Sequence, residues 1–206
     1  MKKELFNLQG LYKVQRKDIK KCADVAAKAF LDDPSSTYLL EKDLSHPKLY
    51  EYYLKAFNAL YTDASIFAPD EAIEGFIILM PPGKTSVSAR RFIESGGLAL
   101  PFSVSFGILS RSLEYESNNL RIRRNVCSDE TWYIFQFGVA PEKQGQGLGS
   151  KLMKPFLNWL DEQQLPCYLE THKQKNVDLY AHYGFILKAT DTLPNKKHTQ
   201  YGMLRP

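Results

Sequence analysis

The sequence predicts an α/β fold, and three observations support this prediction. Segments with apolar residues at helical spacing alternate along the chain with short β-rich segments. Hydrophobic residues make up 44% and charged residues 24% of the 206 residues, which is ordinary globular composition. The sequence contains no internal repeat and no linker rich enough to divide it, so we expect one domain over residues 1–206.

The first third of the chain predicts a strand followed by two helices. Residues 10–18 alternate apolar and polar side chains, as a half-buried strand does. Asp18 can cap a following helix over residues 19–30, whose apolar residues share one face. Pro34 ends that helix, because the residue before a proline avoids helical angles. A second helix is expected from about Pro47, again with apolar side chains at helical spacing.

The middle of the chain predicts a strand pair and a long helical segment. Residues 64–69 and 72–83 are β-rich and are joined by a short turn. Residues 84–125 are helical or irregular and are too long for a simple connection between strands. We therefore expect a helical insertion between the third and fourth strands that covers part of the molecule. The arginine-rich run at residues 118–125 is expected to be a solvated helix face.

The last third alternates strands and helices. Residues 131–139 are almost continuously apolar and β-rich, which is typical of a central strand buried on both faces. A helix with a continuous apolar stripe follows over residues 148–160. The other expected elements are a strand at 166–172, a helix at 174–184 that ends at Gly184, and strands at 185–194 and 198–205.

Composition and charge exclude several classes of protein. The net charge of +4 is too small to indicate a nucleic-acid-binding protein, although it suits a small polyanionic ligand. Three distant cysteines in no metal-like pair favour a reducing compartment, and no group of residues has the spacing of a metal site. The basic N-terminus is followed by no apolar run, and no stretch is long enough to span a membrane. We therefore expect a soluble cytoplasmic protein.

A glycine-rich loop follows the central strand. Gly145, Gly147 and Gly149 lie within five positions, directly before the amphipathic helix, with Lys143 and Lys151 on either side. Backbone N–H groups at a helix N-terminus form an anion site, and glycines let them approach phosphate oxygens closely. The alternative is a tight turn without a ligand. The dinucleotide-binding and P-loop patterns both fail here, because the spacing and order of the residues differ from theirs.

The pattern that does fit is Gln-x-x-Gly-x-Gly, which Gln144, Gly147 and Gly149 supply. With the segment "NVDLYAHYGF" at residues 176–185, it resembles the two signatures of the GNAT superfamily of acyl-CoA-dependent N-acetyltransferases. The similarity is strongest over residues 132–185. It implies a mixed, mostly antiparallel central sheet flanked by helices, and acetyl-CoA as the cosubstrate.

The resemblance also implies roles for individual residues. Tyr180 matches the tyrosine that protonates the departing thiolate, and a phenol can do so because its pKa of ~10 is near that of a thiol at ~8.5. Packing of Tyr180 on the sheet is the alternative. The strand before the loop is expected to splay from its neighbour and pair with the pantetheine arm. The implied cofactor-binding residues are Phe137, Gly138, Val139, Gln144, Gly145, Gln146, Gly147, Leu148, Gly149, Ser150 and Asn176.

The base that deprotonates the acceptor amine is less evident. Some family members carry a glutamate on the central strand, but this chain offers only Gln136 there. Glu170 and His172 are the nearest substitutes, and strand alternation turns both to one face. We choose Glu170 as the catalytic base, with a strand-end salt bridge or a solvated pair as the alternative interpretation.

The acceptor is read from the remaining residues. Asp32 and Asp33 either bind a cationic amine or cap the break before Pro34. Residues 84–125 are expected to form one wall over the acceptor, which favours a primary amine of a small molecule. Two alternatives stay open, which are a non-catalytic acyl-CoA-binding domain and an acetyltransferase acting on a protein amine. The aromatic residues available to line a pocket are Tyr38, Tyr50, Tyr52, Tyr53 and Phe57, several of which must belong to the core.

Overall fold

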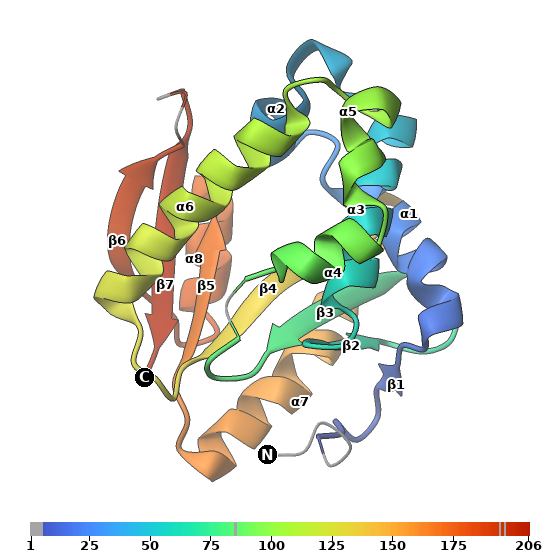
Figure 1. Ribbon diagram of the computed structural model, residues 1–206. Coiled ribbons are helices and arrows are strands. Elements are labelled where there is room, and N and C mark those ends of the chain that lie inside the picture. The colour runs from blue at the N-terminus through green and yellow to red at the C-terminus, as the bar shows by residue number, and fades with distance from the viewer. Residues whose placement is uncertain (1–5, 85, 194, 196) are drawn as a thin grey trace.

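The computed structural model describes residues 6–84, 86–193, 195 and 197–206. Its strands form one seven-stranded sheet in which every neighbouring pair is antiparallel except β4 and β5, which are parallel (Figure 1). The expected mixed, mostly antiparallel sheet is therefore confirmed. In sheet order the strands are β1 (Tyr12–Lys13), β2 (Ser65–Ala68), β3 (Gly75–Met80), β4 (Trp132–Val139), β5 (Cys167–Thr171), β7 (Thr199–Arg205) and β6 (Ile186–Thr192).

The helices follow the predicted order, apart from one additional short helix after the first. The expected insertion between the third and fourth strands is confirmed, and it consists of α4, α5 and α6. Thr85 of the expected insertion and Pro194 of the expected strand at 185–194 lie outside the described residues. The helices are α1 (Ile19–Ala29), α2 (Pro34–Leu40), α3 (His46–Leu60), α4 (Ala89–Glu94), α5 (Leu100–Ser103), α6 (Ile108–Val126), α7 (Leu148–Gln163) and α8 (Gln174–Ala181).

The helices cover both faces of the sheet (Figure 1). Helices α1 and α3 and the insertion pack on one face, and α7 and α8 pack on the other. Alternate side chains of each strand supply the two cores, so that Ile78 belongs to the first and Ile77 to the second. All of β3 is buried. Full burial of a side chain of this size contributes about 1.5–3 kcal/mol, so this central strand fixes the positions of both layers.

The N-terminal segment differs from the prediction in two places. Strand β1 covers only two residues, and a 3₁₀ helix over Arg16–Asp18 follows it. Asp18 is the N-cap residue of α1, as predicted, but its side chain accepts no hydrogen bond from that helix. Its carboxylate accepts hydrogen bonds from the Gln15 backbone and the Tyr12 hydroxyl instead, so it stabilises this 3₁₀ turn. Helix α2 was not predicted. Asp33 is its N-cap, and Pro34 is its first residue, so the proline that ends one helix also begins another.

The C-terminal half of α6 is fastened to the sheet. The Asn118 amide donates to the Gln200 side-chain oxygen over 2.6 Å, and the Gln200 amide donates to the Asn119 oxygen over 2.6 Å. Asn119 and Gln200 are both buried, and buried amides of this kind are costly to leave without partners. These bonds fix one end of the insertion against β7.

Candidate active site

Strands β4 and β5 separate partway along their length. They pair only over Trp132–Ile134 opposite Cys167–Leu169. The register between β3 and β4 shifts at Phe135, the extra residue of a β-bulge, and a bulge increases local twist. Residues 136–139 keep β3 as their partner, but no other described strand pairs with their opposite edge. The expected splay of β4 from its neighbour is therefore present, and it leaves backbone N–H and C=O groups available.

The glycine loop follows this free edge. Gly145 and Gly147 have φ of 75° and 81°, and a Cβ atom at either position would meet no atom within 4 Å. Glycine is therefore required by the backbone conformation, not by close packing. Among the described residues, the N–H groups from Gly145 to Ser150 donate no hydrogen bond. The loop thus presents several unpaired donors at the N-terminus of α7.

The other predicted cofactor-binding residues lie along the same edge and on α8. Phe137 lines the cavity described below, and Gly138 leaves room for the Phe30 ring, which a Cβ atom would approach to 3.0 Å. The Gln144 side chain donates to the Val139 carbonyl over 3.1 Å. Asn176 also lines the cavity, and its amide donates to the Thr171 hydroxyl.

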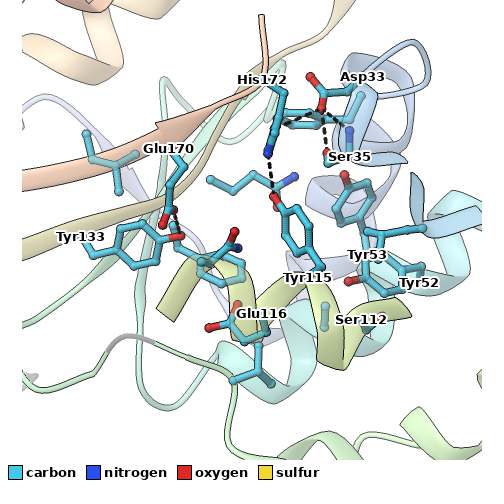
Figure 2. A pocket seen from close by; sticks show the side chains of 18 of the residues that line it. Asp33, Ser35, Tyr52, Tyr53, Ser112, Tyr115, Glu116, Tyr133, Glu170 and His172 are labelled. Atoms are coloured by element: carbon cyan, nitrogen blue, oxygen red, sulfur yellow. Dashed lines mark hydrogen bonds and ion pairs between the residues drawn. The ribbon is translucent and has the colours of Figure 1, made fainter. Parts of the chain in front are cut away.

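A cavity of about 450 Å³ lies between the separated strands and the insertion. Its floor is made by β4, β5 and α8, and its opposite walls by α3, α4 and α6. The insertion therefore forms a wall of this cavity, and its role over an acceptor stays a prediction. Figure 2 shows side chains from α3, α6, β4 and β5 converging on one space. The residues contributed by the insertion are Val87, Ala89, Phe92, Ile93, Leu98, Leu109, Ser112, Leu113, Tyr115, Glu116 and Asn119.

Glu170 is a buried carboxyl group in this cavity, with 4% of its side chain exposed. Its Oε2 accepts a hydrogen bond of 2.5 Å from the Tyr133 hydroxyl (Figure 2). Its Oε1 lies 3.6 Å from the Nε of Arg123 and accepts no hydrogen bond from any described residue. Burial raises the pKa of Glu170 to about 7, although Arg123 and the Tyr133 hydroxyl both lower it. The carboxyl therefore changes protonation near neutral pH.

Arg123 lies beside Glu170 and Tyr133, so the prediction of a solvated helix face at residues 118–125 is wrong for this residue. Its side chain is 3% exposed, whereas Arg121 and Arg124 are exposed. The guanidinium donates to Glu116 over 2.6 Å and lies 4.5 Å from the Tyr133 ring centre. One face of α6 is therefore buried at the spacing 119, 122, 123, and the arginine on that face lies between two carboxyl groups.

His172 and Asp33 form a second polar group in the cavity. The His172 Nε2 lies 3.4 Å from the Tyr115 hydroxyl, and its Nδ1 lies 3.7 Å from Asp33 (Figure 2). Burial lowers the pKa of His172 more than Asp33 raises it, so the imidazole is neutral at pH 7. Glu170 and His172 do face the same space, as strand alternation predicted.

The two aspartates after α1 have different positions. Asp33 is buried, lines the cavity and accepts hydrogen bonds from the Ser35 backbone and hydroxyl, so it also caps α2. Asp32 is 83% exposed, pairs with Lys173 and does not line the cavity. Of the aromatic residues expected around the acceptor, Tyr52 and Tyr53 line the cavity, and the others belong to the surrounding core.

Tyr180 lines the cavity from α8 and is 7% exposed. It packs edge-on against Phe185 at 6.0 Å, so the packing interpretation describes its ring. Its hydroxyl makes no hydrogen bond to any described residue. Burial raises the pKa of Tyr180 above its usual value, so the phenol stays protonated at neutral pH.

Tyr115, Glu116 and Tyr133 are among the cavity residues that were not anticipated from the sequence. Strand alternation was the available signal for Tyr133, because Tyr133 and Phe135 lie on the same face of β4 and both line the cavity. Tyr115 and Glu116 lie in a segment whose orientation depends on the whole insertion, so only the apolar period of α6 offered a signal.

Comparison with known proteins finds similarity to acetyltransferases. The model of the acetyltransferase (GNAT) family matches residues 112–185. An uncharacterised N-acetyltransferase of Schizosaccharomyces pombe is 28% identical, over 84% of this chain and 73% of the relative. The crystal structure of histone acetyltransferase HPA2 and related acetyltransferase from Corynebacterium glutamicum matches with a TM-score of 0.65 and 16% identity, over 95% of this chain and 94% of the other. PaiA N-acetyltransferase from Thermoplasma acidophilum, solved with coenzyme A, matches with a TM-score of 0.55 and 14% identity, over 95% and 96% of the two chains.

The splayed strands, the loop and the cavity define an acyltransferase that takes its acyl group from a coenzyme A thioester. Over residues 112–185 the chain is similar to the GNAT family of N-acetyltransferases, and acetyl-CoA is its cosubstrate. In the described part of the chain, no helix is long and apolar enough to cross a membrane.

Proposed function

We propose that the protein acetylates a primary amine of a small molecule, which attacks the thioester of acetyl-CoA directly. One observation supports this most strongly. The insertion covers the cavity that contains Glu170, a buried carboxyl with one oxygen that accepts no hydrogen bond from the described residues. A covered cavity of about 450 Å³ suits a small acceptor better than a protein segment.

The cofactor side of the site fits coenzyme A. Residues Gly145–Ser150 present unpaired N–H groups to the diphosphate, and the free edge at Phe137, Gly138 and Val139 offers backbone groups to the pantetheine amides. Bound acetyl-CoA supplies the acetyl group as an activated thioester. We also assign contacts with the cofactor to Gln144, in the glycine loop, and to Asn176, on α8.

Glu170 acts as the catalytic base in this proposal. An acceptor amine is an ammonium ion near pKa 10 in water, and only its neutral form is nucleophilic. Because the pKa of Glu170 is about 7, its ionised form is available at neutral pH and can accept the ammonium proton. The Tyr133 hydroxyl and Arg123 hold the carboxylate in place while it does so.

Tyr180 acts as the catalytic acid. The nitrogen forms a bond to the acetyl carbon while the carbon–sulfur bond breaks, and the departing sulfur takes a proton from the Tyr180 hydroxyl. The second proton that the nitrogen loses as it becomes the amide passes to solvent. The hydroxyl is suited to this because it is protonated and makes no other hydrogen bond within the described residues. Proton exchange with solvent returns Tyr180 and Glu170 to their starting forms after release of the amide and coenzyme A.

The proposal is tested by mixing the protein with acetyl-CoA and a panel of amines, while free thiol release and acetylated product are measured. The panel contains small primary amines and peptides with a free N-terminus or lysine. Turnover with small amines that exceeds turnover with peptides supports the proposal. Turnover with peptides alone assigns a protein amine as the acceptor. Binding of acetyl-CoA without thiol release from any amine would overturn it.

A further inference from the structure

We infer that the acceptor is an amphiphilic primary amine, with an apolar body that leaves the cavity across the insertion. This inference rests on the proposed function and narrows the class of its substrate. It names a ligand with one cationic end and an extended alkyl or aromatic part.

The first observation is an apolar patch on the insertion. Nine large hydrophobic side chains of the described residues are exposed, and five of them lie between positions 93 and 113. Exposed apolar side chains are ordinary when scattered, but a cluster indicates an interaction site. We call this cluster the rim patch, and its members with their exposed fractions are Ile93 (52%), Leu98 (57%), Phe102 (84%), Phe106 (83%) and Leu113 (73%).

The second observation is continuity with the cavity. Ile93, Leu98 and Leu113 belong to the rim patch and also line the cavity. Further inside, Phe92 and Leu109 continue the apolar wall. An apolar chain that extends from the cavity toward the solvent therefore contacts apolar side chains of the insertion on its way out.

The third observation is the charge at the inner end. Glu116 and Glu170 lie on either side of Arg123, at 2.6 Å and 3.6 Å. When both carboxyls are ionised, they carry one more charge than this guanidinium offsets. An ammonium group of the acceptor supplies the missing positive charge, and Tyr115 and Tyr133 also line the cavity in this region (Figure 2).

These three features together select against very polar amines. A polyamine or an amino sugar would place charges or hydroxyls against the rim patch, where they find no partners. A second copy of the chain or another protein over the patch would close the exit from the cavity, because three patch residues are part of its lining. The apolar part of the acceptor is thus the occupant that uses both surfaces.

The test uses n-alkylamines from propylamine to decylamine, with 1,4-diaminobutane as the polar amine. Burial of one methylene group in the acceptor channel is expected to raise kcat/KM about fourfold. We expect kcat/KM to rise with chain length, and 1,4-diaminobutane to be the poorest substrate. The double variant Leu98→Ser, Leu113→Ser is expected to lose about tenfold in kcat/KM for decylamine and less than about twofold for propylamine. The matched control is Ile186→Ser, an apolar residue on β6 that is 50% exposed and does not line the cavity.

Three outcomes would overturn the inference. One is a kcat/KM that does not depend on chain length, and another is a preference for 1,4-diaminobutane over decylamine. The third is a dimer in analytical ultracentrifugation that Phe106→Ser dissociates, together with a normal kcat/KM for decylamine in the Leu98→Ser, Leu113→Ser variant, since this assigns the rim patch to a second copy. Failure of the proposed function looks different, because then no small amine of either kind releases thiol.

Discussion

The two sides of the site are built in different ways. On the cofactor side, the groups that we assign to coenzyme A are mostly backbone N–H and C=O groups, freed by the splay of β4 and by the conformations of Gly145 and Gly147. On the acceptor side, the polar groups are side chains from α2, α6, β4 and β5. Backbone recognition needs a short contiguous motif, whereas the acceptor side depends on residues far apart in the sequence. Substitutions on the two sides should therefore change different quantities.

The largest effect is expected for Glu170→Gln. Glutamine keeps the size of the side chain but cannot accept the ammonium proton, so kcat/KM should fall by about 10²–10⁴-fold. Affinity for coenzyme A should stay unchanged, because Glu170 belongs to the acceptor side. Steady-state kinetics and calorimetry measure the two quantities, and Glu162→Gln, an exposed residue on α7, is the control. A Glu170→Gln variant with normal turnover would contradict the assigned base.

Arg123→Met should mainly lower stability. Methionine leaves Glu116 and Glu170 buried without their shared cation, and breaking a buried ion pair costs about 3–5 kcal/mol in the free energy of unfolding. Chemical denaturation measures this loss. Because Arg123 lowers the pKa of Glu170, its removal should also move the pH dependence of any remaining activity upward. Unchanged stability would mean that the two carboxyls are already neutral in the native protein.

Tyr180→Phe tests the proposed catalytic acid, which lies between the cofactor side and the acceptor side. The variant keeps the ring that packs on Phe185 and loses only the hydroxyl. We expect kcat to fall by about 10²-fold, with little change in coenzyme A affinity. Tyr201→Phe serves as a control. Equal turnover in the wild type and the Tyr180→Phe variant would remove Tyr180 from the mechanism.

The pH dependence should follow Glu170. Its ionised form is the base, and its pKa is about 7, so kcat/KM at pH 6 should be about tenfold below its plateau. The raised pKa of Glu170 also makes the free energy of unfolding depend on pH. The native carboxyl holds its proton more tightly than the unfolded one, so the stabilising contribution is complete below pH 4.5 and is lost as the pH rises through about 7. Glu170→Gln should abolish the pH dependence of both kcat/KM and stability. A pH dependence near 7 that persists in this variant would have to come from another titratable group.

The smallest effect is expected for Gly147→Ala. An alanine at φ 81° is strained by about 1–2 kcal/mol and disturbs the donors beside it, so coenzyme A affinity should fall by about tenfold. Gly10→Ala is a matched control, since Gly10 has φ 79° and open space around it. Both variants should lose similar stability, but only Gly147→Ala should weaken binding. Equal affinities in the two variants would contradict the loop assignment.

The fold was more accessible from the sequence than the acceptor side of the site. The element order and the insertion followed from local periodicity and turn residues. The sequence missed α2, because Pro34 was interpreted only as a helix end and not as a first helical residue. It also assigned Arg123 to solvent, because a charge run hides the helical period that buries one of its members.

The same reasoning explains the uneven result within the site. Glu170 could be chosen from strand alternation, a local property. Its contacts with Tyr133 and Arg123 join residues 37 and 47 positions away, and no pattern in one sequence reports such contacts. The dual position of Asp33, as cap and cavity residue, likewise depends on how α2 meets β5.

The hydrogen bonds of Asn118 and Asn119 to Gln200 have a consequence for the evolution of specificity. They fix the later half of α6 to the sheet. The preceding residues 86–113 therefore form one segment, between β3 and this fixed end, that can change as a unit. After gene duplication, changes in residues 86–113 could give the protein a new acceptor while the residues that bind coenzyme A stay the same. Descendants of one such ancestor are then expected to differ most in this stretch of the chain.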